Sequence, residues 1–192
     1  MTHITILGDG TMGQAIAGIV AKGGTTVEVF GSSDQDQSVT GSMVILAVPY
    51  PAVEQILSER SGQLDGRVVV DITNPLNFET FDSLVVAPDG SAAQELAGKL
   101  PQSKVLKAFN TNFAATLQSA TVGGEVPTTV LVAGDDQDAK QTLIGIVCAG
   151  GLKALDVGSL KRARELEALG FLQLTLAADD KVPWSAGFAV IS

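Results

Sequence analysis

The chain begins with a short apolar run, Ile4–Leu7, that leads directly into a glycine-rich turn and then into an amphipathic segment, Gln14–Val20. The turn reads Gly8-Asp9-Gly10-Thr11-Met12-Gly13. In a strand, turn and helix of this kind, the first glycine forms the tight turn, the second lets the backbone approach a pyrophosphate, and the third lets the helix pack on the strand. The helix N-terminus then points its free N–H groups at the phosphates. This context predicts a dinucleotide site, and the alternative is an ordinary glycine-rich turn.

Composition limits the classes of protein to consider. With 45% apolar residues the chain can bury a large core, and its formal net charge of −9 argues against binding to nucleic acid or to an anionic membrane surface. No apolar run approaches the roughly 18 residues of a membrane span, and the first residues lack the basic start of a signal peptide. We therefore expect a cytoplasmic protein that binds small molecules. Cys148 lies among apolar neighbours, which predicts a buried thiol.

Predicted strands and helices alternate along the chain. Strands are expected at Ile4–Leu7, Thr25–Phe30, Met43–Val48, Arg67–Ile72, Lys104–Phe109, Thr128–Ala133 and Leu152–Val157. Helices are expected at Thr11–Lys22, Ala52–Arg60, Ala92–Leu100, Phe113–Ser119 and Gln137–Gly145, and a stripe of leucines from Leu160 to Leu176 predicts a last helix with a solvated charged face. The alternation indicates an α/β fold, a Rossmann-like, doubly wound and mostly parallel sheet with a small C-terminal helical extension.

The organisation departs from the usual pattern between the second and third strands. The segment Gly31–Ser42 is too short for a helix and a further strand, so Gln35–Ser42 is predicted to be a loop and the second crossover helix to be missing. We expect a nucleotide-binding domain over residues 1–120 and a C-terminal extension over residues 121–192. The tail of that extension holds Trp184, which is expected either to cover the site or to pack in the core.

Ligands of such sheets bind beyond the carboxyl ends of the strands, so the segments that follow the strands are the candidate site. These segments are Gly8–Gly13, Gly31–Asp34, Pro49–Pro51, Thr73–Leu76, Asn110–Asn112 and Gly134–Asp136. The last is predicted to be a turn and helix cap rather than a metal site, and no metal site is predicted elsewhere. Roles as a plain turn for Thr73–Leu76 and as a helix cap for Asn110–Asn112 stay open.

The turn after the second strand bears on the choice of nucleotide. It reads Gly31-Ser32-Ser33, where an NAD site usually carries an acidic residue that binds the ribose. Serine hydroxyls and exposed N–H groups can donate to a 2′-phosphate, so NADP is favoured over NAD. The alternative is a polar turn that makes no contact with the ribose.

Several later motifs, in this order, resemble the deazaflavin (coenzyme F-420)-dependent NADP reductases and the related NADPH-binding domains of metalloreductases. The resemblance rests on the two turns above and on Leu46-Ala47-Val48-Pro49-Tyr50, Val70-Asp71-Ile72-Thr73-Asn74-Pro75-Leu76, Lys107-Ala108-Phe109-Asn110-Thr111, and Asp156-Val157-Gly158 followed by Ala163-Arg164-Glu165-Leu166-Glu167. It implies NADP(H) as the cofactor, a flavin or deazaflavin as a co-substrate and, by analogy, a homodimer. In one departure, Ser33 stands where the family commonly has an arginine.

The resemblance also implies which residues bind the cofactor. Gly8, Gly10, Thr11, Met12 and Gly13 would lie on the pyrophosphate, Gly31, Ser32 and Ser33 at the 2′-phosphate, Ala47, Val48 and Pro49 against the adenosine, and Thr73, Asn74, Pro75, Ala108, Phe109 and Asn110 around the nicotinamide.

The chain offers few proton donors for a ketone substrate. His3 precedes the first strand, Tyr50 lies on the adenosine side, and Lys107 is expected in a surface or packing role, so no catalytic acid is predicted. Hydride transfer to a flavin-like ring needs only stacking and alignment. We therefore predict an NADP(H)-dependent oxidoreductase that transfers hydride between the nicotinamide and a small flavin-like or deazaflavin acceptor. A non-catalytic NADPH-binding sensor is the alternative, and a dehydrogenase of a small hydroxy acid or imine is a third interpretation.

Overall fold

The computed structural model describes residues 2–191 and is built around a seven-stranded sheet with the order β2-β1-β3-β4-β5-β8-β9. These strands are β1 (His3–Leu7), β2 (Thr26–Phe30), β3 (Met43–Leu46), β4 (Val68–Asp71), β5 (Lys104–Lys107), β8 (Thr129–Gly134) and β9 (Lys153–Gly158). A two-stranded ribbon, β6 (Thr121–Val122) and β7 (Val126–Pro127), was not predicted. The seven main strands lie at nearly their predicted positions. The inner strands of the sheet are largely buried, as near-continuous apolar runs require, whereas the edge strands β2 and β9 are only partly buried.

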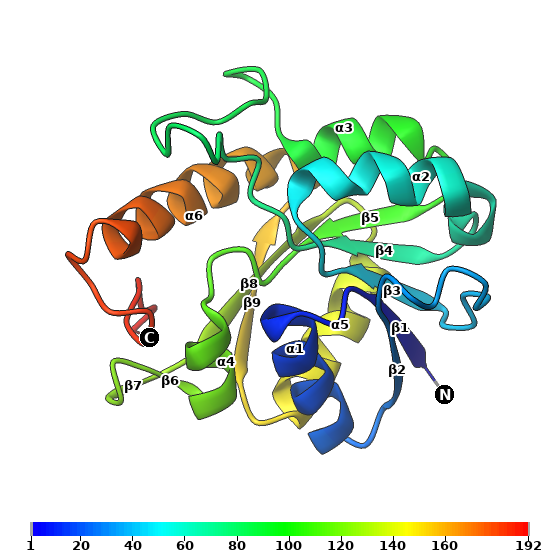
Figure 1. The fold of residues 1–192 in the computed structure, drawn as a ribbon. Helices are drawn as coiled ribbons and strands as arrows, with labels where there is room; N and C mark the ends of the chain where they lie inside the picture. The colour runs from blue at the N-terminus through cyan, green and yellow to red at the C-terminus, as the bar shows by residue number, and fades with distance from the viewer. Residues whose placement is uncertain (1, 192) are drawn as a thin grey trace.

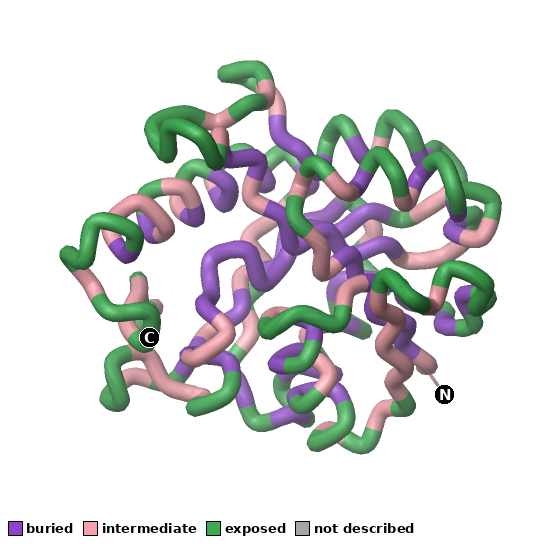
Figure 2. Tube along the Cα trace, in the orientation of Figure 1, coloured by how far each residue is buried: buried purple, intermediate pink, exposed green. Residues whose placement is uncertain are grey.

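Helices cover both faces of the sheet (Figure 1). One face carries α1 (Thr11–Lys22), α4 (Ala114–Ser119) and α5 (Gln137–Ala149), and the other carries α2 (Tyr50–Leu64), α3 (Ala92–Lys99), the short 3₁₀ helix η1 (Leu160–Arg162) and α6 (Ala163–Ala178). Two clusters of buried apolar side chains fill these two layers, and Figure 2 shows the buried strands between helices whose outer sides are exposed. The predicted α/β, doubly wound and mostly parallel architecture is confirmed.

The carboxyl ends of five parallel strands lie in one row. Leu7 is the register partner of both Phe30 and Leu46, Leu46 pairs with Asp71, and Asp71 pairs with Lys107. The segments that follow these strands therefore leave the sheet side by side, as the candidate site requires.

Strand β8 breaks this pattern, because it runs antiparallel to β5, with Leu106 opposite Gly134. The connection through α4 and the β6–β7 ribbon leads directly into β8 without first carrying the chain back to the end of the sheet where β5 begins. Gly134–Asp136 thus lies at the opposite edge of the sheet, and its place among the segments of the candidate site was wrong. The predicted cap is confirmed, since the Asp136 carboxylate accepts the amide of Ala139 at 2.8 Å. Strands β8 and β9 share the sheet with the first five strands, and a domain boundary at residue 120 stays a prediction.

No helix interrupts Gly31–Ser42 between β2 and β3, so the missing crossover is confirmed. None of the helices within residues 2–191 combines the length and apolar character that a membrane span requires.

One prediction of burial was wrong, and another holds only in part. Cys148 is exposed, because its buried neighbours Ile146 and Val147 occupy the inner face of α5 and the next position of the helix turns outward. The predicted leucine stripe is buried only in part, since Leu160 and Leu166 are each 5% exposed but Leu172 is 49% exposed. The inner residues of α6 are Ala163, Leu166, Glu167, Gly170, Gln173 and Ala177.

Candidate dinucleotide site

The glycine-rich turn between β1 and α1 is built so that two glycines shape the backbone and one keeps space open. A Cβ at Gly8, where φ is +121°, would lie 2.1 Å from the carbonyl oxygen of Ala47, and a Cβ at Gly13 would lie 1.9 Å from the carbonyl oxygen of Gly8. At Gly10 no other atom lies within 4 Å of the added carbon. Gly10 is thus free to face a ligand, as the predicted pyrophosphate contact requires.

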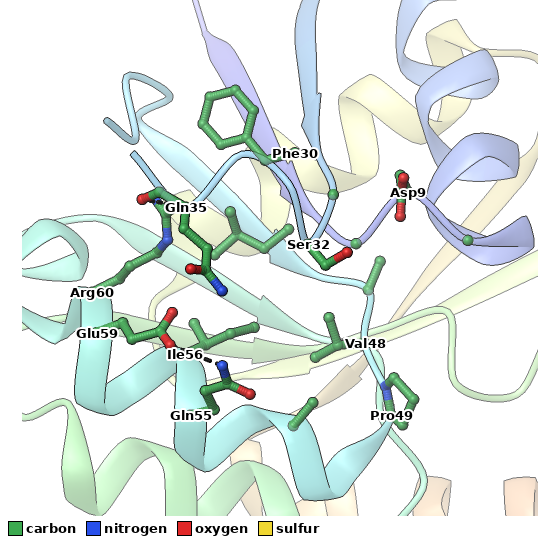
Figure 3. A pocket seen from close by; sticks show the side chains of 16 residues that line it. Asp9, Phe30, Ser32, Gln35, Val48, Pro49, Gln55, Ile56, Glu59 and Arg60 are labelled. Carbon is green, nitrogen blue, oxygen red and sulfur yellow. Dashed lines mark hydrogen bonds between the residues drawn. The ribbon is translucent and has the colours of Figure 1, made fainter. Parts of the chain in front are cut away.

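This turn opens into a cavity of about 370 Å³, a volume in the range of small-molecule sites (Figure 3). Seven predicted site residues line it, namely Gly8, Gly10, Gly31, Ser32, Ala47, Val48 and Pro49. Thr11, Met12 and Gly13 follow as the first residues of α1, and Ser33 is exposed beside Ser32. We call it the adenosine cavity, after the ligand that the sequence predicts there.

The remaining lining residues were not predicted as site residues. They are Leu7, Asp9, Phe30, Gln35, Ala52, Gln55, Ile56, Glu59 and Arg60. Five of them recur at helical spacing on one side of α2, which begins at Tyr50 rather than at the predicted Ala52. That spacing, together with the absence of a crossover helix to cover this side, was the signal in the sequence that could have found them.

Carboxylates surround the turn predicted to hold a 2′-phosphate. The amide of Gly31 donates to Asp34 Oδ2 at 2.8 Å, so this N–H is not free as predicted. A Cβ added at Gly31 would lie 2.4 Å from Asp9 Oδ2. An anion at this turn would therefore need a cation nearby.

The residues predicted around the nicotinamide form a separate group at the ends of β4 and β5, and none of them lines the adenosine cavity. Two asparagine side chains join the segments: Asn110 Nδ2 donates to Asn74 Oδ1 at 2.9 Å, and Asn74 Nδ2 donates to the carbonyl of Asn110 at 2.9 Å. Asn110 Nδ2 also donates to the carbonyl of Leu166 in α6 at 2.8 Å. Gly170 lets α6 approach this pair, since a Cβ there would lie 2.4 Å from Asn74 Oδ1.

Some polar atoms of this group lack partners. Thr73 Oγ1 and Asn110 Oδ1 are buried, and nothing in residues 2–191 forms a hydrogen bond with them. Phe109 has a φ of +63°, which is costly for a bulky residue and recurs at functional sites. Pro75 and Ala108 are buried beside them. The group thus holds buried polar atoms without partners, and α6 closes over it.

The alternative role of this segment as a helix cap was wrong. Helix α4 starts after Phe113, and no side chain caps it. Asn112 Nδ2 instead donates to the carbonyl of Thr129 at 3.2 Å, which ties the end of β5 to β8.

A buried ionic cluster lies beneath these residues. The ammonium of Lys107, fully buried, lies 2.8 Å from Asp71 Oδ2, 2.8 Å from Glu167 Oε1 and 2.6 Å from the carbonyl oxygen of Thr73. Glu167 also accepts the amide of Ala92 at 2.9 Å at the start of α3. Burial raises the pKa of Glu167, and the nearby Lys107 opposes that rise. The predicted solvated charged face of α6 was thus wrong at Glu167.

The other two candidate proton donors are Tyr50 and His3. Tyr50 donates from its hydroxyl to Glu95 Oε2 at 2.9 Å, and burial together with that carboxylate raises the pKa of the phenol. His3 lies at the start of β1, with Nδ1 3.1 Å from Thr40 Oγ1. Neither residue lines the adenosine cavity, and Lys107 is committed to its buried partners.

The C-terminal tail reaches the same region. Buried Gln173 of α6 donates to the carbonyl of Thr111 at 3.2 Å and accepts the amide of Phe188 at 3.1 Å. Trp184 lies against Phe113, with ring centroids 4.9 Å apart, and is 52% exposed. The tail is thus tied to the end of β5, and its tryptophan lies outside the core.

In residues 2–191 no group of three or more His, Cys, Asp or Glu side chains is arranged to hold a metal ion.

The fold and the glycine-rich turn define the class as a Rossmann-like dinucleotide-binding protein. The family model described as "NADP oxidoreductase coenzyme F420-dependent" matches residues 26–75. An F420-dependent NADP reductase of Methanocaldococcus jannaschii is 31% identical over 79% of this chain and 69% of its own length. The chain belongs to the family of F420-dependent NADP reductases, which confirms the predicted family and the predicted class of NADP-dependent oxidoreductase.

Two further comparisons extend this result. Metalloreductase STEAP3 of Rattus norvegicus is 34% identical over 78% of this chain, and the matched region covers 28% of that protein. A crystal structure assigned as an F420-dependent NADP reductase, from Arthrobacter sp. FB24, matches the whole of both chains with a TM-score of 0.85 and 22% identity, and so shows the same fold.

Proposed function

We propose that this protein transfers hydride between the nicotinamide of NADP(H) and a deazaflavin or flavin-like ring. The observation that supports the proposal is the row of strand ends, along which an open cavity and a group of buried polar atoms without partners both lie. The deazaflavin is proposed as the acceptor because the similar reductases are named as F420-dependent.

The cofactor would lie along this edge. Gly10 and the free N–H groups of the first turn of α1 would bind the pyrophosphate, with Thr11 and Met12 beside them. Ser32 and Ser33 would lie at the 2′-phosphate, and Val48 and Pro49 would pack on the adenosine.

The nicotinamide would lie at the group around Thr73, Asn74 and Asn110. The unpartnered Thr73 Oγ1 and Asn110 Oδ1 fit a ligand with hydroxyl and amide groups, because a buried polar atom without a partner costs free energy. Pro75, Ala108 and Phe109 would supply the apolar contacts there.

Bound NADPH supplies the hydride. The chain would contribute alignment rather than a proton, because Lys107 already contacts three oxygen atoms in the interior and Tyr50 is bonded to Glu95. A ring that accepts hydride without a proton from an enzyme side chain suits such a site.

A non-catalytic NADPH sensor is the second candidate. The closure of the predicted nicotinamide group by α6, with Gly170 against Asn74, favours it, since a nucleotide could bind through its adenosine half alone. The predicted homodimer stays a prediction under either function.

One assay separates the two functions. NADPH oxidation is followed at its own absorbance with FMN, FAD and a deazaflavin offered in turn, alongside NADH and a binding titration. Turnover with one ring supports the reductase and identifies the acceptor, whereas tight binding without turnover favours the sensor. A protein that binds neither NADPH nor NADH contradicts both.

A further inference from the structure

The α2 side of the adenosine cavity holds an arginine that the sequence did not mark as a site residue. Arg60 comes from α2 and is 7% exposed, and its side chain lies beside Gln35 of the Gly31–Ser42 loop (Figure 3). Its Nη2 donates to the carbonyls of Asp34 at 2.8 Å and of Gln35 at 2.7 Å, and Nη1 donates to the carbonyl of Gln37. A guanidinium has five N–H donors, so two remain beyond these three bonds.

Arg60 lacks a counter-ion in the part of the chain that the structure describes. No Asp or Glu carboxylate lies within 4.0 Å of it among the ion pairs of residues 2–191. The neighbouring Glu59 side chain accepts from Gln55 Nε2 at 2.8 Å instead. A buried charge without an opposite charge is costly, and neutral carbonyls satisfy its donors without balancing it.

The charge balance of the adenosine cavity points to an anion from outside. Among the described residues that line it, Arg60 carries the only positive charge, while Asp9 and Glu59 carry negative charges. Asp34 adds a third carboxylate at Gly31. A phosphate dianion here would meet repulsion from these groups and attraction from Arg60 alone, through charge-assisted bonds.

We infer that Arg60 supplies the cation that selects the 2′-phosphate of NADP(H), from α2 rather than from the turn after β2. The inference rests on the proposed function. The cation can come from α2 because the short Gly31–Ser42 loop leaves residues of α2 lining the adenosine cavity. Arg60 thus both holds the shape of the loop and binds the 2′-phosphate.

The two roles of Arg60 can be separated because a second arginine has only one of them. Arg67 also holds this loop, through the carbonyls of Val39 at 3.1 Å and Thr40 at 3.4 Å and that of Gly41, but it does not line the adenosine cavity. Arg67→Gln therefore loosens the loop without removing a charge from the cavity.

The experiment measures calorimetric affinities for 2′,5′-ADP and 5′-AMP, which differ only in the 2′-phosphate. Wild-type protein is expected to prefer 2′,5′-ADP. Arg60→Gln should lower this preference by about tenfold or more, as expected for loss of a charge-assisted phosphate contact, whereas Arg67→Gln should weaken both probes by the same factor. An Arg60→Gln protein that keeps the wild-type preference overturns the inference.

A second variant covers the case in which Arg60→Gln fails to fold. Gln35 is exposed and lines the adenosine cavity, so Gln35→Glu offers the guanidinium a carboxylate from the chain itself. This variant should lose the preference for 2′,5′-ADP while still binding 5′-AMP, and an unchanged preference counts against the inference.

Wild-type protein that binds NADPH without favouring 2′,5′-ADP also overturns the inference but leaves the proposed function standing. Wild-type protein that binds neither NADPH nor either probe rejects the proposed function itself.

Discussion

The two ends of the candidate site are built in different ways. The adenosine cavity is open, and backbone turns and one side of α2 form it. The group predicted to hold the nicotinamide is closed, and the Asn74–Asn110 pair, an ionic cluster and α6 form it. The difference teaches that backbone geometry prepares one half of such a site, whereas the other half depends on side chains that meet only when distant segments fold together.

The largest expected effect is at the closed end. Lys107→Met would leave Asp71 and Glu167 buried without their cation, so the free energy of unfolding should fall by about 3–5 kcal/mol. Loss of Lys107 also removes the charge that opposes the raised pKa of Glu167. A raised carboxyl pKa means that stability is kept at acid pH and lost as the pH rises through that pKa. Denaturant titrations at pH 5 and pH 8 should therefore show the greater loss at pH 8.

The control is Lys99→Met, which breaks an exposed ion pair with Glu54 and should cost less than about 1 kcal/mol. Equal losses in the two variants would mean that the buried cluster adds no more than a surface pair.

At the open end, Gly10→Val should abolish nucleotide binding and leave the fold intact, because its added atoms enter empty space that the pyrophosphate would occupy. We expect NADPH affinity to drop by at least about 100-fold, or about 2.7 kcal/mol. Fluorescence titration with NADPH measures it. Gly18→Val, at an exposed position of α1 with equally open space, is the matched control and should bind normally. Unaltered affinity in Gly10→Val would remove the pyrophosphate from this turn.

Gly170→Ala should separate the two ends. Its Cβ would lie 2.4 Å from Asn74 Oδ1 and 2.9 Å from the carbonyl oxygen of Asn110, so α6 must move away, at a cost of about 1–3 kcal/mol. Affinity for 2′,5′-ADP should stay unchanged, because the adenosine cavity is not touched. Gly98→Ala in α3 meets no atom within 4 Å and should not destabilise the protein. A parallel loss of 2′,5′-ADP affinity in Gly170→Ala would show that the two ends are not independent.

Ser33→Arg tests the turn beside the adenosine cavity. An added guanidinium should tighten NADPH binding about fivefold, worth about 1 kcal/mol, through a charge-assisted contact with the 2′-phosphate. NADH binding should not change, and Ser33→Gln should show no gain. Titrations in which NADPH and NADH tighten together would argue that the ribose lies elsewhere.

The smallest effect concerns Glu28, which anchors the far end of the Gly31–Ser42 loop by accepting from Thr5 Oγ1 at 2.5 Å and Thr40 Oγ1 at 2.8 Å. Burial alone would raise the pKa of Glu28, but these hydrogen bonds outweigh it and lower the pKa below the ordinary value of 4.5. A lowered carboxyl pKa gives stability that is present above pH 4.5 and is lost as the pH falls.

Glu28→Gln should therefore reduce the acid-induced loss of stability, by less than about 1 kcal/mol. Thermal melts between pH 3 and pH 6 measure it, with Glu54→Gln on the exposed outer side of α2 as the control. An acid limb identical to that of the wild type would mean that Glu28 does not contribute to it.

Local patterns predicted most of the fold. Apolar runs located the seven strands of the sheet, and the short Gly31–Ser42 segment predicted the missing helix. The direction of β8 could not be predicted, because an apolar strand reads the same whichever way it pairs. The ribbon β6–β7 is too short to leave a pattern.

The turns that border the adenosine cavity were predictable, since Gly8–Gly13 and Gly31–Ser33 are continuous motifs, whereas its α2 side was not predicted. The closed end was not, because the contacts of Asn110 with Leu166 and of Lys107 with Glu167 join residues about 60 positions apart. Charge alone suggested a solvated face for Glu167, and only the folded structure shows its buried cation.

Arg60 and Arg67 donate hydrogen bonds to backbone carbonyls of the Gly31–Ser42 loop, and every amino acid has such a carbonyl. The side chains of Gln35 to Ser38 therefore have little part in holding the shape of the loop. Substitutions there should be tolerated as long as Arg60 in α2 and Arg67 after α2 are kept. Residues at the border of the adenosine cavity can thus be substituted, in evolution or in a randomised library, to alter nucleotide preference while the fold is kept.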